Sequence, residues 1–250
     1  MSSNTEPQSP PPLQRRSTTR RIAKWAATVI VLYLVFAYVV APALWRLYAY
    51  RHPSFDGVPR ITETGDHHPG DPLNVALIGT EIEVKRILVA ARWYPADPLT
   101  LRSCLEIAEA SVLKRPYDAA PVSNLYLMGR KQDLAFEQPV DDNPRERHHV
   151  RFWRTERVDP DGRPLWVGAA IFDQRVGISR TTLQITHFIA PDIDAERDYL
   201  FRDLERTKRL AEVFVVDDFH QVREGKNGGG DPWHTDGKLY AGVIAGNPER

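Results

Sequence analysis

Residues 73–80 read LNVALIGT, a short apolar run that closes with a glycine and a threonine. The run from Leu73 to Ile78 has the length and composition of a buried strand. Thr80 is a good helix N-cap residue. Apolar side chains follow it at helical spacing, at Ile82, Ile87, Leu88 and Ala91. The stretch therefore predicts a strand, a turn and a helix.

The chain after this unit changes from helical to strand-like patterning. A second helical stripe runs from Pro98 to Leu113. Five segments then alternate or cluster β-branched and aromatic residues: Asn124 to Met128, Asp133 to Val140, His148 to Val158, Leu165 to Arg175 and Thr181 to Ile189. A helix is expected over Asp192 to Arg209, and strands over Val213 to Val216 and Leu239 to Ile244. The predicted fold class is α/β (α+β), a largely antiparallel mixed sheet with flanking helices, preceded by one transmembrane helix.

An uncharged stretch of about twenty residues, WAATVIVLYLVFAYVVAPAL from Trp25 to Leu44, precedes the domain. At 1.5 Å rise per residue, such a helix spans the roughly 30 Å hydrocarbon core of a bilayer. A signal peptide is the alternative. The run, however, exceeds the ~7–15 residues of a signal h-region, and no clear small-x-small cleavage site follows it. The sequence predicts an uncleaved, single-pass anchor over residues 22–48.

The segments beside the anchor predict its orientation and the domain boundaries. Basic residues gather before the span, at Arg15, Arg16, Arg20, Arg21 and Lys24, and fewer follow it. This bias favours a cytoplasmic N-terminus in the cell inner membrane and a periplasmic or extracytoplasmic C-terminal domain. Residues 1–21 are rich in Ser, Pro and Thr and predict a disordered tail. Residues 49–71 predict a linker, and residues 72–246 predict the globular domain.

The charge balance argues against a nucleic-acid partner, and the cysteine content excludes stabilisation by disulfide bonds within the chain. Acidic and basic residues balance at 33 each, so the chain has no global field that would attract nucleic acid. The expected contact is instead the lipid bilayer, with a membrane-protein or secretion partner. Cys104 is the single cysteine, which excludes an intramolecular disulfide framework.

Common catalytic and nucleotide-binding motifs are absent. Gly79 lacks the further glycines of a GxGxxG fingerprint, and the glycines of residues 225–230 do not have P-loop spacing. Neither a GxSxG nucleophile elbow nor an HExxH zinc helix occurs. The sequence therefore identifies no complete catalytic motif.

Polar residues with period-two spacing form the main candidate site. His149, Arg151 and Trp153 share one face if their segment is a strand. If DPDGRP at residues 159–164 closes a hairpin, Asp173 falls opposite His149 to within a residue or two. A second turn around Val176 to Arg180 would bring His187 beside Asp173. Two imidazoles and a carboxylate would then converge, and the acidic pair Asp192 and Asp194 would lie close behind.

Such a cluster suits two kinds of chemistry. Neutral imidazole and carboxylate bind a divalent metal such as zinc or manganese, and histidine titrates near neutral pH for acid/base work. The predicted catalytic residues are His149, Asp173 and His187. The structural alternative is a self-satisfied network on a sheet face, with Trp153 in the core and Asp192 at a helix N-terminus. The sequence leaves the cofactor and any reaction open.

A glycine-rich loop from Gly225 to Gly237 is a second candidate region. It carries Asp231, His234 and Asp236, and long loops beside a sheet often hold binding sites. The structural alternative is a hairpin connection closed by Asp236-Gly237, a strong turn pair.

From Pro72 to about Ile244 the chain resembles the LssY C-terminal domain family, named for a component of a bacterial type I secretion locus. The matching residues are DPLNV at Asp71 to Val75, ARW at Ala91 to Trp93, Tyr117, APVSNLYL at Ala120 to Leu127, GRKQDLAFE at Gly129 to Glu137, HVRFW at His149 to Trp153, LWVGAA at Leu165 to Ala170, Thr186-His187, DIDAERD at Asp192 to Asp198 and TDG at Thr235 to Gly237. The resemblance implies work at a membrane surface, because multidomain relatives carry this domain after membrane-embedded segments. It supplies no catalytic residues.

Two classes of function follow from the sequence. One is a membrane-anchored binding or accessory module of the bacterial envelope, in transport or secretion. The other is a metal-assisted or His/Asp-dependent hydrolase, phosphatase-like, at the membrane surface. The first is preferred because no complete catalytic motif is present.

Overall fold

The computed structural model describes residues 16–96, 124–140, 143–178 and 185–246, which belong to two compact units. The first unit is Met1–His52 and the second is Pro53–Arg250. The helix predicted from Pro98 to Leu113, together with Cys104, lies outside the described residues.

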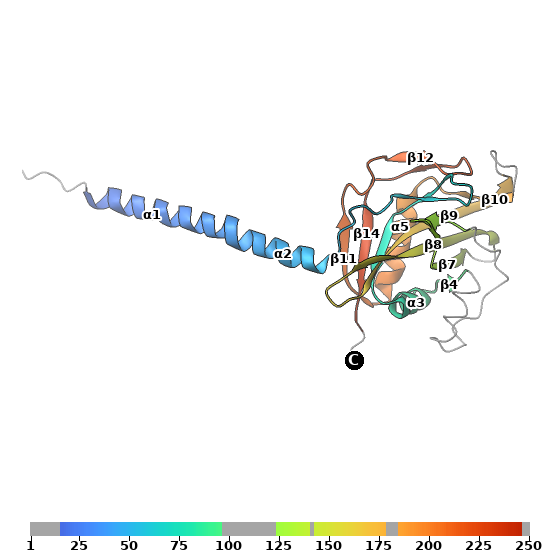
Figure 1. Cartoon of the computed structure of the whole chain (residues 1–250), viewed down its shortest axis with the longest axis horizontal. Coiled ribbons are helices and arrows are strands. Elements are labelled where there is room, and N and C mark those ends of the chain that lie inside the picture. Colours follow the sequence, from blue (N-terminus) through green and yellow to red (C-terminus); the bar gives the residue numbers. More distant parts are fainter. Residues whose placement is uncertain (1–15, 97–123, 141–142, 179–184, 247–250) are drawn as a thin grey trace, which may run out of the picture. The chain divides into compact units, whose positions relative to one another are not determined.

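The N-terminal unit is a helical run with one π-helical turn (Figure 1). It consists of α1 (Arg16–Val35), the π-helix η1 (Phe36–Val40) and α2 (Ala41–Arg51). Pro42 has no N–H to donate to the preceding turn, and a wider turn is one way for a helix to absorb that loss. The stretch Thr19–Tyr50 is long and apolar enough to cross a membrane, as the sequence predicted for a single span.

The main sheet has eight strands in the order β11-β14-β3-β9-β8-β7-β4, and β10 pairs with β9. These strands are β3 (Val75–Ile78), β4 (Tyr94–Pro95), β7 (Leu134–Val140), β8 (Asn143–Val158), β9 (Pro164–Ile178), β10 (Ile185–Ile189), β11 (Leu210–Val216) and β14 (Leu239–Ile244). Only the pairing of β14 with β3 is parallel; the other described pairings in this sheet are antiparallel. The predicted mixed, largely antiparallel sheet is confirmed.

Two small sheets complete the strands. The first has the order β2-β1-β5-β6 and the second pairs β12 with β13. Their bounds are β1 (Ile61–Glu63), β2 (Pro69–Pro72), β5 (Tyr126–Leu127), β6 (Arg130–Lys131), β12 (Glu224–Lys226) and β13 (Pro232–His234).

The segment 49–71, which the sequence predicts as a linker, differs from that prediction. It contains β1 and most of β2, and Phe55 and Val58 are buried in the domain core. Prolines suggested an open chain, but proline is tolerated at strand ends and sheet edges, where no ladder hydrogen bond is lost. The compact unit accordingly begins at Pro53.

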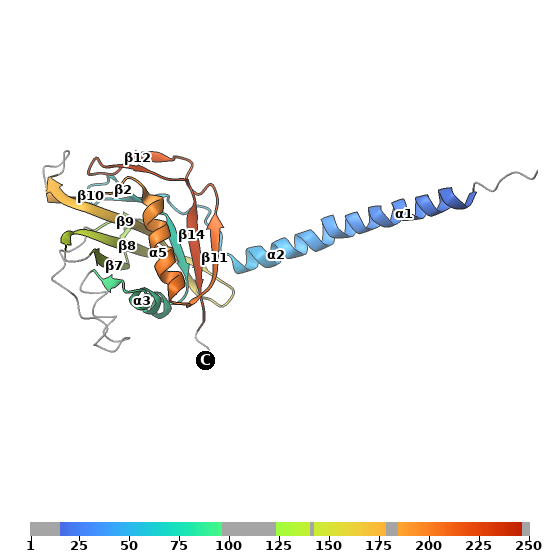
Figure 2. The same ribbon diagram turned by 180° about the vertical axis from the view of Figure 1, so that it is seen from behind.

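Two helices cover one face of the main sheet: α3 (Glu81–Ala90) and α5 (Ile193–Arg206). Figure 2 shows α5 lying across that face. Thr80 caps α3 as predicted, because its hydroxyl accepts from the Glu83 N–H while Glu83 accepts from the Thr80 N–H. Apolar residues from the sheet and both helices form the first core cluster, including Leu77, Phe152 and Leu200.

The opposite face of the main sheet packs a second cluster. It joins Trp153, Val167 and Ala169 of the main sheet to Leu127 of β5 and to Leu125, just before that strand. The alternation of β8 thus sends Val150 and Phe152 toward the helices and Trp153 toward the small sheet. This second face also carries the polar residues singled out in the sequence.

The DPDGRP segment forms the hairpin turn between β8 and β9, as predicted. Asp159 accepts hydrogen bonds from the N–H groups of Asp161 and Arg163. Gly162 has φ +74°, a conformation that favours glycine. This turn determines the pairing of Val158 with Pro164, where the two longest strands meet.

Candidate functional site

The register of β8 and β9 brings the predicted residues onto one buried sheet face. His149 lies opposite Ile171, and Asp173 lies opposite Arg147, two residues from the expected position. Val158 still pairs with Pro164 as the turn predicts, and an irregularity between Arg154 and Val158 shifts the remaining pairs. A shift of two residues keeps side chains on the same face. His149 and Asp173 therefore remain neighbours.

Arg147 is held between two carboxylates from the neighbouring strands. Its Nε lies 3.1 Å from Asp173 Oδ2 on β9, and its Nη1 lies 3.2 Å from Glu137 Oε2 on β7. All three side chains are at most 7% exposed, so this charge network is removed from water. Buried charges require such pairing because an isolated one would cost several kcal/mol of desolvation.

Arg151 links the same face to the small sheet. Its Nη1 donates to Asp71 Oδ2 on β2 at 3.1 Å and lies 2.7 Å from His149 Nε2. Burial lowers the pKa of the Arg151 guanidinium, while the carboxylates of Asp71 and Asp173 raise it and offset part of that effect. The ion pair between Arg151 and Asp71 thus links the main sheet to the four-stranded sheet.

The contacts of His149 assign its tautomer. A guanidinium can only donate, so the Nε2 beside Arg151 must accept, and the ring proton is on Nδ1. Nδ1 lies 3.3 Å from Asp173 Oδ2, but the two atoms are not aligned for a hydrogen bond. His149 is 2% exposed, so both ring nitrogens are directed at protein groups rather than at solvent. This arrangement can hold Arg151 and Asp173 in position, but it offers no base that solvent or a substrate could reach.

His187 lies on β10, which pairs with β9 as the sequence anticipated. Its backbone partner is Val176, and the β10 residue opposite Asp173 is Ile189. The His187 side chain is outside the described part of the structure. Its convergence with His149 and Asp173 thus remains a prediction.

Trp153 is a core residue. It is fully buried in the second cluster, and its Nε1 donates to the Arg130 carbonyl at 3.3 Å. Its position agrees with the structural alternative stated for this side chain.

Asp192 and Asp194 stabilise the start of α5. The Asp192 carboxylate is the N-cap and accepts from the N–H groups of Asp194 and Ala195, each at 3.1 Å. Asp194 accepts from the Thr235 hydroxyl at 2.8 Å and from Arg197 at 3.0 Å. Both aspartates thus have local structural partners.

Asp236 and Asp194 share Arg197, which ties α5 to the glycine-rich loop. Arg197 Nη1 lies 2.9 Å from Asp236 Oδ1, and the guanidinium carbon lies 4.1 Å from the centre of the Tyr240 ring. Burial lowers the pKa of Arg197, but hydrogen bonds to Asp236 and Asp198 raise it more. Burial raises the pKa of Asp236, but Arg197 and the Lys238 N–H lower it to below its usual value.

His234 lies in the same loop, at the end of β13, and its backbone forms a bridge with Asp192. Its side chain is exposed, and its backbone N–H donates to the Pro191 carbonyl at 2.8 Å. The loop forms a hairpin of β12 and β13 whose turn lies at residues 227–231, whereas Asp236 and Gly237, expected to close a hairpin, follow β13.

The sequence did not identify three members of the network: Asp71, Glu137 and Arg147. Arg147 lies two residues before His149, as His149 lies two before Arg151. The spacing alone therefore predicts that its side chain is on the same face of the strand. Glu137 lies opposite His149 on β7, which required the strand register. Asp71 comes from a segment predicted to be a linker, and no sequence signal placed it here.

A second polar pair lies on the helix side of the sheet, where His148 projects from β8. Its Nδ1 lies 2.8 Å from Glu196 Oε2 on α5, and its ring stacks on Tyr199 at 3.9 Å between centroids. The His148 side chain is 15% exposed, and its Nε2 makes no hydrogen bond within the described residues. Glu196 Oε1 is buried and likewise has no hydrogen-bond partner there.

Burial raises the pKa of Tyr199, and the negative charges of Asp203 and Glu196 add to that effect. The Tyr199 hydroxyl therefore stays protonated, and it donates to Gln138 Oε1 at 2.6 Å. The neighbourhood of His148 is thus acidic and aromatic.

No three His, Cys, Asp or Glu residues are arranged to hold a metal ion within residues 16–96, 124–140, 143–178 and 185–246. The ligand set proposed from the sequence includes the His187 side chain, which lies outside the described part of the structure.

The comparisons with known proteins give one match. The model of a family described as LssY C-terminus matches residues 55–239, which is most of the domain. No curated protein and no solved structure matches the chain.

Proposed function

The chain belongs to the LssY C-terminal family, and on that basis we propose that it is a membrane-anchored envelope protein whose extracytoplasmic domain is a binding or accessory module. Its setting would be transport or secretion at the inner membrane. The candidate helix Thr19–Tyr50 supports anchoring, and the basic residues before it support a cytoplasmic N-terminus.

One observation carries the choice of a binding module over an enzyme. His149 and Asp173 are each 2% exposed and lie within a network of guanidinium and carboxylate groups. Acid/base chemistry needs a group that reaches the substrate directly or through one water. Residues that are buried and committed to each other contribute to the fold, and recognition then falls to the surface of the domain.

A reporter fused after Arg250 tests the anchoring and the orientation. A reporter that is active only in the periplasm should be active, and cell fractionation should place the fusion in the membrane. Release of a shortened protein into the periplasm would identify the helix as a signal sequence, and activity of a cytoplasmic reporter would reverse the orientation.

Metal content of the purified full chain tests the binding module against the hydrolase expected from His149, Asp173 and His187. We expect no ion in stoichiometric amount after mild chelation. An ion that is retained by the native chain and lost from His187→Ala, with unchanged melting temperature, would overturn the proposal and favour the metal-assisted hydrolase.

A His-dependent hydrolase at the membrane surface is the second candidate, and the His148–Glu196 pair favours it. A carboxylate on Nδ1 orients the imidazole and stabilises its protonated form, which leaves Nε2 to accept a proton from water. The partial exposure of His148 is what this role requires and what His149 lacks.

Hydrolysis of a chromogenic phosphomonoester by the full chain tests this second candidate. If the pair is catalytic, His148→Gln should reduce the rate at least a hundredfold, the low end for general acid–base catalysis. Loss of the rate in His149→Gln, with His148→Gln unaffected, would exclude His148 as the base.

A further inference from the structure

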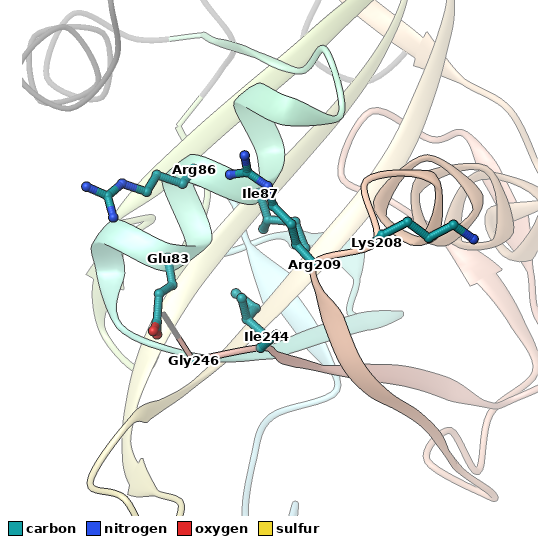
Figure 3. A pocket seen from close by; sticks show the side chains of 8 residues that line it. Glu83, Arg86, Ile87, Lys208, Arg209, Ile244 and Gly246 are labelled. Atoms are coloured by element: carbon teal, nitrogen blue, oxygen red, sulfur yellow. The ribbon is translucent and has the colours of Figure 1, made fainter. Parts of the chain in front are cut away.

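A groove of about 470 Å³ opens between α3 and the turn that joins α5 to β11. Its floor is apolar, formed by Ile87 and Ile244, and Arg86, Lys208 and Arg209 also line it; Figure 3 shows Arg86 and Lys208 on opposite sides of it. The groove is separate from the polar network of β8, because no residue of that network lines it.

The three cations of the groove are not neutralised by the domain. Within the described residues, the side chains of Arg86, Lys208 and Arg209 form no ion pair and no hydrogen bond. The carboxylate that also lines the groove, Glu83, accepts a hydrogen bond from the Thr80 N–H at 2.7 Å and is part of the α3 capping box. The groove therefore carries an excess of positive charge.

Lys208 occupies a backbone position that favours glycine. Its φ is +58°, in the left-handed region, just beyond the C-terminal end of α5. A side chain other than glycine or asparagine is disfavoured in that conformation. A lysine at this point retains a cation at the groove despite conformational strain.

The directions of the three side chains agree with mutual repulsion. In Figure 3, Arg209 lies beside Ile87, whereas Arg86 and Lys208 point outward from opposite sides of the groove. All three side chains are exposed and long, so they can turn inward at small cost. An anion placed over the apolar floor would supply the attraction that brings them together.

We propose that this groove binds the phosphate group of an organic phosphate, either a lipid headgroup or a soluble phosphate compound. Two arginines offer planar donor forks that match phosphate oxygens, and the lysine adds a point charge. The volume exceeds that of a phosphate ion, so the groove also has room for the attached portion of the compound. The proposal names a ligand for the binding module and so rests on the proposed function.

Titration calorimetry of the full chain in a neutral detergent tests the groove with two probes. Glycerol 3-phosphate represents the soluble source, and short-chain phosphatidylglycerol represents the lipid source, with short-chain phosphatidylcholine as its zwitterionic control. Arg209→Ala should weaken binding of the preferred probe about tenfold, because it removes one charge-assisted contact.

Lys208→Gly is the more discriminating variant. Glycine relieves the left-handed strain, so the melting temperature should not fall, while phosphate affinity should fall about tenfold. Met128→Gly is the matched control, because Met128 is also exposed and has φ +53° far from the groove residues in sequence. That control should keep full affinity.

Saturable binding of either phosphate probe, weakened by Arg209→Ala and Lys208→Gly but not by Met128→Gly, supports the proposal, and the preferred probe identifies the source. No saturable binding of either probe, or binding that all three variants preserve, overturns it. Neither result alters the reporter and metal measurements, whereas a cytoplasmic C-terminus would overturn the proposed function whatever the groove binds.

Discussion

Arg147 is the residue on which the buried network of β8 depends most. Its guanidinium contacts both Glu137 and Asp173, so removing it leaves two carboxylates buried beside each other. We expect Arg147→Met to reduce the free energy of unfolding by about 3–5 kcal/mol. Chemical denaturation of the full chain in detergent measures the change. Arg154→Met on the same strand is the control and should cost less than about 0.5 kcal/mol, because Arg154 is exposed. Equal losses in both variants would contradict a special role of the network.

His220 makes the stability of the domain depend on pH. Burial lowers the pKa of its imidazole, only partly offset by the hydrogen bond that Nε2 donates to the Leu73 carbonyl at 2.6 Å. The unfolded chain therefore binds a proton more readily, with a pKa of about 6.5, and the folded state is favoured above that pH. Stability should fall as the pH drops below about 6.5 toward the lowered pKa.

The variant His220→Gln keeps an N–H donor for Leu73 but cannot titrate, so its stability should change less between neutral and mildly acidic pH. Thermal unfolding at both pH values measures this difference. His234→Gln, at an exposed position, should behave like the native chain. An identical pH response in His220→Gln and the native chain would show that other groups cause it.

At the level of elements, the start of α5 distinguishes a cap from a ligand. Asp192→Ala removes the acceptor for two N–H groups and should cost about 1 kcal/mol of stability. Asn is nearly as good a cap, so Asp192→Asn should retain most of that stability. Thermal unfolding compares the two variants. A metal or substrate role would instead make Asp192→Asn lose binding while it keeps its stability, because the amide preserves the cap but removes the charge.

The elements that the sequence predicted well are those with strong periodicity. The residues of α3, β8, β9 and α5 show clear spacing, and the cap at Thr80 and the turn at residues 159–164 mark their ends. The short strands β1, β2, β12 and β13 have only three or four residues each, too few for a period to appear.

The polar network was predictable only in part, because part of it depends on how separate strands pair. His149, Arg151 and Asp173 follow from strand alternation and one turn, and the two-residue error arose from an irregularity that has no sequence signal. Glu137 and Asp71 join the network through neighbouring strands whose register depends on tertiary pairing. The pairing of His148 with Glu196 required knowledge of how α5 packs on the sheet.

At the level of the whole molecule, the boundary between anchor and domain can be tested by truncation. A fragment that begins at Pro53 contains Phe55, Val58 and β1, and it should be soluble and unfold cooperatively without detergent. A fragment that begins at Asp71 lacks these parts of the second core cluster and should aggregate or unfold at a lower temperature. Circular dichroism melting curves of both fragments provide the comparison. Equal stability would place the domain boundary near residue 71.

The parallel pairing of β14 with β3 constrains the order in which the main sheet can form. Strand β14 lies between β11 and β3, and it aligns Tyr240 with Val75, so the sheet joins the beginning of the domain to its end. A chain whose residues 239–244 have not yet been synthesised lacks β14 and cannot complete this sheet. The strand order thus leaves the two strands that flank β14, β3 and β11, unjoined until the end of the domain is synthesised.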